Sequence, residues 1–230
     1  MSFELPLPAF QADEAPREGS QAAAYLRQLL LEAVPGLDVV AVARRPGVLA
    51  KVAVRSGSVP GDVLAQLRAE FGGERIETVR WSSEPRAFIA AALGLEDVPP
   101  IVLKPAIRHA IVLIGEIDVR GLSGWRGINR HLASAVTGWR IHLRPVAETP
   151  AWGMLKRAMA ERRSLAAIVL GRTRQGLRVE LEGLHARLPR ADLIAHGAEV
   201  RVRVTRMDPD EGTILVTRRF AQTGQLPLPR

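Results

Sequence analysis

The sequence predicts an α/β protein built from two related α/β modules followed by a small β-barrel. Three observations carry this prediction. Helix-like and strand-like segments recur twice in the same order, the chain changes character after Pro145, and the segments beyond that point are short, β-rich and separated by glycine-containing turns. Hydrophobic residues make up 47% of the chain and charged residues 24%, which is typical of a chain that buries a core.

The first module is predicted over residues 19–82, after a proline-containing and acidic arm over residues 1–18. Ser20 is placed to cap a helix that stops at Pro35-Gly36. Arg44-Arg45-Pro46-Gly47 reads as the turn of a hairpin between two β-rich runs. The predicted elements are a helix over 20–33, strands over 39–43 and 50–54, a helix over 61–71 and a strand over 75–79.

The second module repeats this order over residues 83–145. Its pattern differs from the first at one place, where Ser123 to Gly127 separates two consecutive helices. The predicted elements are a helix over 85–95, strands over 101–103 and 110–114, helices over 117–122 and 128–136, and a strand over 140–143.

A helical linker over residues 146–163 leads into the predicted barrel, which covers residues 164–220 and is followed by a loose tail over 221–230. Its turns fall at Gln175-Gly176, Glu182-Gly183 and between Asp208 and Gly212. Short strands with regular turns favour a barrel over a layered α/β sheet. The strand-like runs lie over 165–170, 177–181, 198–206 and 213–218.

The charge balance points to a polyanionic partner. Lys and Arg number 32 against 24 Asp and Glu, which gives a net charge of +8. No cysteine is present, and the amino-terminal arm lacks the features of a signal peptide, so we expect a cytoplasmic protein without a membrane-spanning segment. Phosphate-loop, nucleophile-elbow and zinc-protease motifs are missing, and the five histidines have no paired spacing. The sequence therefore predicts neither an enzyme nor a metal or cofactor site.

Several ordered motifs resemble one known family. Residues 19–143 resemble the tandem KH region of NusA-like transcription factors, and residues 164–220 resemble the OB-fold of the S-one type in the same family. The motifs that carry the likeness are Val42–Gly47 before Lys51–Val54, Gly72–Ile76, Val79–Ser82, Pro85–Leu93, Gly124–Ala133, Val136–Trp139, Gly183–Asp192 and Gly197–Val204.

This resemblance implies two tandem type II KH-like modules followed by a five-stranded OB-fold barrel. The order is rearranged, because the family places its OB-fold before the KH pair. A counterpart of the family's polymerase-binding amino-terminal domain is not recognisable, so the resemblance implies RNA binding and does not extend to the polymerase-binding domain. The segment from Ser56 to Gly61 lacks the Gly-x-x-Gly turn of the family's first KH module, which is therefore expected to be degenerate.

Within the resemblance, the turn Gly124-Trp125-Arg126-Gly127 is the predicted RNA clamp. Two glycines let the backbone turn tightly and let a sugar-phosphate chain approach it, and the following helix directs N–H groups and its positive dipole end at the phosphates. Trp125 either stacks on a base or packs on the neighbouring module. The predicted RNA contacts are Gly124, Trp125, Arg126, Gly127, Asn129 and Arg130.

The barrel strands offer cations but no aromatic residue for stacking, so RNA binding there would be largely electrostatic and sensitive to salt. A solvated basic face explains the same residues equally well. The candidates are Arg172, Arg174, Arg178, His185 and Arg187.

The leading hypothesis is a factor that binds single-stranded RNA and regulates transcription elongation, termination or antitermination. The partners would then be nascent transcripts and RNA polymerase. Two alternatives stay open: a factor that binds rRNA and associates with the ribosome in translation, and an adaptor whose modules bind protein. None of these three hypotheses includes a membrane as a partner.

Overall fold

The computed structural model describes residues 20–189 and 194–218. The predicted arm and tail lie outside the described residues. The fold is mixed α/β, as predicted, and divides into two compact units. One unit holds the described residues up to Ile111 together with Gly121–His142, and the other holds Val112–Arg120 together with those from Leu143 onward. Each unit is described separately below.

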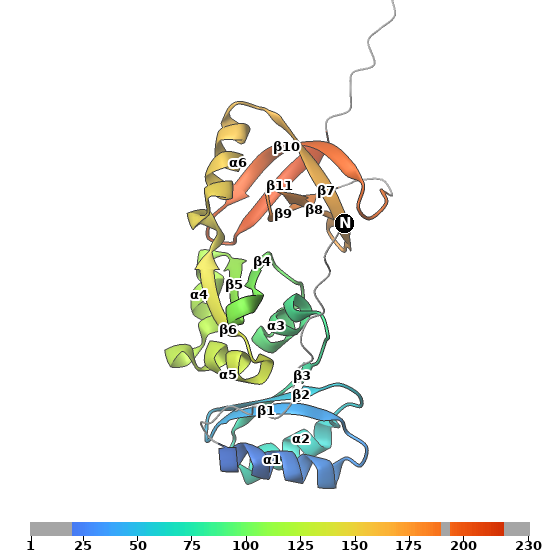
Figure 1. Cartoon of the computed structure of the whole chain (residues 1–230), viewed down its shortest axis with the longest axis vertical. Helices are drawn as coiled ribbons and strands as arrows, with labels where there is room; N and C mark the ends of the chain where they lie inside the picture. Colours follow the sequence, from blue (N-terminus) through green and yellow to red (C-terminus); the bar gives the residue numbers. More distant parts are fainter. Residues whose placement is uncertain (1–19, 190–193, 219–230) are drawn as a thin grey trace, which may run out of the picture. The chain divides into compact units, whose positions relative to one another are not determined.

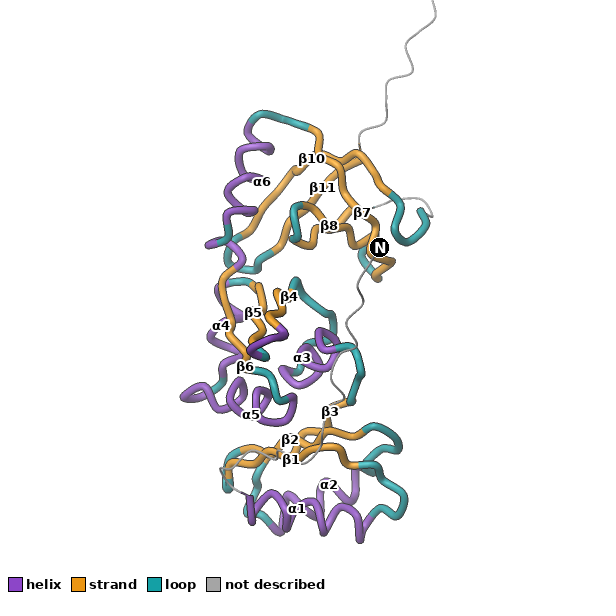
Figure 2. The backbone as a smooth tube through the Cα atoms, in the orientation of Figure 1, coloured by secondary structure: helices purple, strands orange, loops and turns teal. Residues whose placement is uncertain are grey.

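The first module confirms the predicted order of elements (Figures 1 and 2). Its sheet has the order β1-β2-β3, with β1 antiparallel and β3 parallel to the central strand β2. The parallel register runs from Leu49 opposite Arg75 to Val54 opposite Arg80. The elements are α1 (Ser20–Ala33), β1 (Val39–Arg45), β2 (Leu49–Val54), α2 (Gly61–Glu70) and β3 (Arg75–Arg80).

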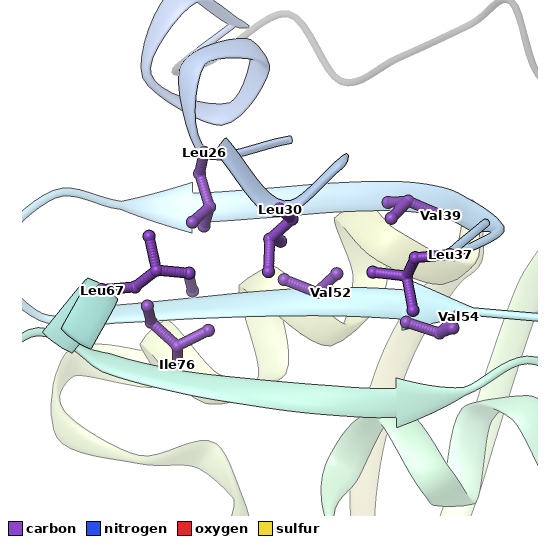
Figure 3. Packing of buried hydrophobic residues seen from close by; sticks show 9 residues of the cluster. Leu26, Leu30, Leu37, Val39, Val52, Val54, Leu67 and Ile76 are labelled. Atoms are coloured by element: carbon purple, nitrogen blue, oxygen red, sulfur yellow. The ribbon is translucent and has the colours of Figure 1, made fainter. Parts of the chain in front are cut away.

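One face of this sheet packs on α1 and α2. Figure 3 shows Leu26 and Leu30 of α1 and Leu67 of α2 directed at Val52 and Ile76 of the sheet, and all five are buried. Apolar residues three to four apart on each helix, and every second residue on each strand, supply this core. The hydrophobic pattern of the sequence therefore fixes which face of the sheet is covered by its own helices.

The opposite face of the same sheet is also covered. Every residue of β2 is buried, and α5, a helix of the second module (Ile128–Thr137), contacts β1 and β2. Lys51 alternates with the core residues of β2, is fully buried, and pairs through Nζ with Glu77 Oε2 at 2.5 Å. Burial lowers the pKa of Lys51, against the opposing effect of the Glu77 carboxylate. Lys51 is thus a buried charged residue at the contact between the two modules, and Glu77 balances its charge.

The second module also follows the predicted order, with strands arranged β4-β5-β6. Glu84 caps α3 by accepting hydrogen bonds from the Arg86 and Ala87 N–H groups, and Gly94 ends that helix in the left-handed conformation. The elements are α3 (Pro85–Leu93), β4 (Ile101–Lys104), the 3-10 turn η1 (Pro105–Ile107), β5 (His109–Ile114), α4 (Glu116–Ser123), the 3-10 turn η2 (Trp125–Gly127), α5 and β6 (Arg140–Pro145).

Five strands form a closed barrel in the order β10-β11-β9-β8-β7, which confirms the predicted barrel. Alternate residues of β8 and β9 point inward and are buried. The strand β9 was not among the predicted strand-like runs, because the turn at Glu182-Gly183 leaves it only five residues long. The elements are η3 (Val146–Glu148), α6 (Pro150–Ala160), β7 (Ser164–Thr173), β8 (Gly176–Leu181), β9 (Leu184–Leu188), β10 (Glu199–Asp208) and β11 (Thr213–Arg218).

The predicted helical linker is the helix α6, which belongs to the same unit as the barrel and contacts β10. Thr149 caps it by accepting a hydrogen bond from the Trp152 N–H, and Trp152, Leu155 and Ala158 are buried. Their spacing of three residues places them along one helical face. The apolar face explains why this helix packs on the barrel and is not a solvated spacer.

A close glycine contact lies within this second unit. The hairpin between β10 and β11 meets the start of α4, where Pro209 O and Asp210 O accept hydrogen bonds from the N–H groups of Glu116 and Ile117. A Cβ on Gly115 would lie 2.5 Å from Asp210 O, and one on Gly212 would lie 2.6 Å from Gly115 N. Both positions require glycine because the two backbones touch. The first N–H groups of α4 are therefore satisfied by protein.

In the part of the chain that the structure describes, no helix is long and apolar enough to cross a membrane.

Candidate nucleic-acid interface

The turn Gly124 to Gly127, called the clamp below, links α4 to α5 and has an unusual backbone. Gly124, Arg126 and Gly127 have φ angles of 70°, 52° and 74°. Glycine adopts such left-handed values without cost, whereas an arginine is strained by them. The Gly127 N–H donates to Gly124 O at 3.0 Å and closes the turn. The clamp is therefore a preformed, tightly curved segment.

The two glycines are required for different reasons. A Cβ on Gly124 would lie 2.9 Å from the Asn129 Cβ and 3.2 Å from its backbone nitrogen, so both space and conformation exclude a side chain. On Gly127 a Cβ would meet only the Arg130 Nη2, at 3.6 Å. Gly127 is therefore needed for its left-handed φ, and the space beside it is open to a ligand.

Behind the clamp, the amino terminus of α5 has no side-chain cap. Gly127 occupies the cap position, and the first turn of α5 carries no acidic residue. No Asp or Glu occurs between Asp118 and Glu148, although that stretch contains five arginines. An uncapped helix amino terminus presents N–H groups and a positive dipole end. The site is therefore suited to a phosphate group.

The structure gives Asn129 and Arg130 bonds to the protein itself. Asn129 Nδ2 donates to Leu122 O at 2.7 Å and to Leu93 O at 3.4 Å, which joins the start of α5 to α4 and α3. Arg130 Nη1 donates to Ile141 O at 3.1 Å. These bonds hold the clamp against its neighbours, and RNA contact by either side chain stays a prediction.

Trp125 and Arg126 form an exposed pair at the tip of the clamp. The Trp125 side chain is 66% exposed, and the Arg126 guanidinium lies 4.6 Å from the centre of its ring. Of the two interpretations of Trp125, packing into a neighbouring module does not fit this exposure. An exposed indole beside a cation offers a flat surface on which a base can stack.

A cavity of about 670 Å³ adjoins the clamp within the first unit. The clamp and α3 line one part of it, and α2 and β3 of the first module line another. The basic side chains on its walls are Arg68 and Arg75, and the Arg68 Nη2 donates to Ile76 O at 3.0 Å. The sequence reasoning missed this contribution of the first module, because the cavity joins residues far apart in the chain.

The barrel brings together part of its predicted set. Arg178 of β8 and Arg187 of β9 lie directly opposite each other, and the neighbouring pair joins Glu180 to His185. Arg187 Nη1 donates to Gln175 Oε1. Like charges in opposite positions of a sheet repel unless an anion or acceptor offsets them. Arg172, which lies opposite Leu177, and Arg174 in the following turn are exposed, and the register separates them from the arginine pair.

The histidines do not form a metal centre in the described ranges, where no group of three or more potential ligands gathers.

Comparison with known proteins places the chain beside one family of transcription factors. It is 29% identical over 136 residues to the transcription termination/antitermination protein NusA of Bacillus subtilis, covering 54% of this chain and 37% of that protein. The corresponding protein of Thermus thermophilus is 31% identical over 152 residues, covering 59% and 39%. That of Mycobacterium tuberculosis strain H37Rv is 32% identical over 126 residues, covering 50% and 36%. The chain is thus similar to NusA over about half of its own length.

The likeness to NusA is partial, because the chain spans less than two fifths of the length of these curated relatives. No family model matches the chain. A solved structure titled "Crystal structure of APE1850" has a TM-score of 0.39 and 16% identity and covers 54% of this chain and 96% of its own, a likeness too low to assign a fold.

Proposed function

We propose that this NusA-like chain binds single-stranded RNA at the clamp and acts in transcription termination or antitermination. The observation that carries the proposal is the uncapped, acid-free amino terminus of α5 behind a turn in which the space beside Gly127 is open. A phosphate would accept hydrogen bonds from these N–H groups, and the Trp125 ring would stack on an adjacent base. The NusA relatives, named for termination and antitermination, support the biological setting.

Single-stranded RNA fits the site better than a duplex. The cavity beside the clamp is lined by apolar residues, by arginines and by Glu77, a mixture suited to one splayed base with its phosphate. In an A-form helix the bases are paired and stacked, so their Watson–Crick edges are not available to a protein cavity. Binding to a single-stranded RNA should therefore exceed binding to a hairpin of the same composition.

The test is a pair of substitutions that each add one carboxylate. Gly127→Asp introduces a residue that tolerates the left-handed conformation and for which there is space at this position. Its carboxylate places a negative charge at the phosphate site. Gly61→Asp adds the same charge to the start of α2, in open space and at an ordinary φ. We expect Gly127→Asp to weaken RNA binding at least about tenfold and Gly61→Asp to leave it nearly unchanged.

Fluorescence anisotropy with a labelled single-stranded RNA measures both affinities, and circular dichroism checks the fold. Gly127→Asn, which keeps the conformation without the charge, should bind almost as well as the parent. Equal affinities for the Gly127→Asp and Gly61→Asp proteins would contradict the clamp assignment.

The biological setting has a separate test. Sedimentation of a tagged chain with RNA polymerase or with ribosomes, at low and moderate salt, separates the transcription proposal from its translation alternative. We expect association with the polymerase, in line with the names of the relatives. Exclusive sedimentation with ribosomes would overturn the transcription role while leaving RNA binding intact.

A further inference from the structure

A second cationic surface lies on the sheet of the second module. Strand alternation puts Ile101, Ala110 and Ile141 in the core, so the residues between them face the other way. We call that other side the open face. It carries cations from all three strands and from the turn before β5. They are Lys104, Arg108, His109, Arg140 and His142.

Four of these side chains gather around His109 and His142, and Arg108 is joined to them through its backbone. The rings of His109 and His142 lie 5.7 Å apart in an edge-on arrangement, and the Arg140 N–H donates to Arg108 O at 2.8 Å. Burial lowers the pKa of His109, and the charges of His142, Lys104 and Arg140 lower it further. The cluster therefore concentrates positive charge around one half-buried imidazole.

In the ranges that the structure describes, no carboxylate is paired with the basic side chains of this cluster. The strands β4, β5 and β6 contain no Asp or Glu, and among residues 20–189 and 194–218 no carboxylate pairs with Lys104, Arg108 or Arg140. Within the same ranges the buried His109 Nε2 has no hydrogen-bond partner. Buried polar atoms are normally satisfied, and gathered like charges are unfavourable without a counter-ion. One anionic group at this place would offset the charge, and its oxygen would accept a hydrogen bond from His109 Nε2.

We propose that the open face binds a phosphate of the RNA backbone, as a second contact separate from the clamp. The clamp and strand β6 lie in the same stretch of sequence, which has no carboxylate between Asp118 and Glu148 and whose net positive charge attracts a polyanion. Lys104, Arg108 and Arg140 supply charge, and His109 supplies a hydrogen bond to the phosphate. The inference rests on the proposed RNA binding and adds a second place where the RNA is held.

The first test neutralises two of the cations. Lys104→Gln with Arg140→Gln should weaken binding of a labelled single-stranded RNA about tenfold at low salt and reduce the slope of log K against log salt by about 0.7, since the site holds one phosphate. Lys156→Gln with Arg157→Gln removes the same charge from the exposed side of α6 and is the matched control. Lys104→Arg with Arg140→Lys should retain the parent slope.

The second test uses the histidines. The parent protein should bind RNA more tightly at about pH 5.5 than at about pH 8, because phosphate binding favours the protonated imidazole, whose ordinary pKa is roughly 6.5. His109→Asn with His142→Asn should remove most of this pH dependence, whereas the Lys156→Gln with Arg157→Gln control should keep it. Circular dichroism confirms the fold of each variant.

The outcomes separate this inference from the clamp proposal. If Gly127→Asp weakens binding while the Lys104/Arg140 variant binds with the parent's affinity and salt slope, the clamp stands and the open-face site is wrong. If the Lys104/Arg140 variant loses binding to an acidic polypeptide but not to RNA, the face binds protein and the RNA assignment is wrong. Additive losses from the two surfaces support both.

Discussion

The two modules share one strand order but differ in what joins their second and third strands. Between Val54 and Arg75, all of which the structure describes, the first module has one helix, α2, whereas the second has α4, the clamp and α5. The sheet therefore forms with or without the clamp. The first module, whose central strand is covered on both faces, serves as support and as one wall of the cavity, while the second presents the glycine turn.

The largest expected effect concerns the support role of the first module. Glu74, whose side chain is fully buried, accepts hydrogen bonds from Arg44 Nε and Nη2 and from the Gly47 N–H. Glu74→Ala leaves the buried Arg44 charge without its carboxylate partner and should lower the free energy of unfolding by about 3–5 kcal/mol. Urea unfolding followed by circular dichroism measures the loss. The double variant Arg44→Ala with Glu74→Ala should recover part of it, and a loss below about 1 kcal/mol for Glu74→Ala would show that the pair does not support the module.

The next effect concerns α4, the helix that the first module lacks. Gly115→Ala forces a methyl group onto the backbone of the β10–β11 hairpin and should cost about 1–3 kcal/mol of stability. Gly153→Ala, in open space inside α6, should instead stabilise by about 0.5–1 kcal/mol. Thermal unfolding shows whether Gly115→Ala lowers the unfolding midpoint and Gly153→Ala raises it. Equal midpoints would mean that the hairpin does not hold the start of α4.

A smaller effect is expected at the clamp itself. Arg126→Gly relieves the left-handed strain and should stabilise the protein by about 1 kcal/mol while it weakens RNA binding, because a charge at the phosphate site is lost. Arg126→Asn, a residue that tolerates this conformation, separates the two contributions. An RNA affinity unaffected by Arg126→Gly would remove this side chain from the interface.

The smallest effect is a dependence on pH. The pKa of His109 is lowered in the folded protein, so the unfolded chain binds the proton more readily. The stability that depends on the neutral ring is present above the unfolded pKa of roughly 6.5 and is lost as pH falls through it toward the lower folded value. His109→Gln should therefore lose less stability than the parent between about pH 7.5 and pH 5.5. Parallel losses in urea unfolding at the two pH values would contradict this.

Much of this comparison could be predicted from the sequence. Glycine–proline punctuation and apolar periodicity located nearly every element, and the missing Gly-x-x-Gly of the first module indicated its single helix. The bonds that fix Asn129 and Arg130, the cavity wall formed by Arg68 and Arg75, and the Gly115–Gly212 contact could not be predicted. Each depends on residues distant in the chain, which local patterns do not bring together.

The most direct test of the central claim compares the two modules in one experiment. Ultraviolet crosslinking of the full chain to a single-stranded RNA, followed by mass spectrometry of the crosslinked peptides, shows where RNA touches the protein. We predict crosslinks in the peptide that contains Trp125 and none in the peptide that spans Ser56 to Gly61. Crosslinks at Ser56 to Gly61 without any at Trp125 would contradict the assignment of the clamp to the second module.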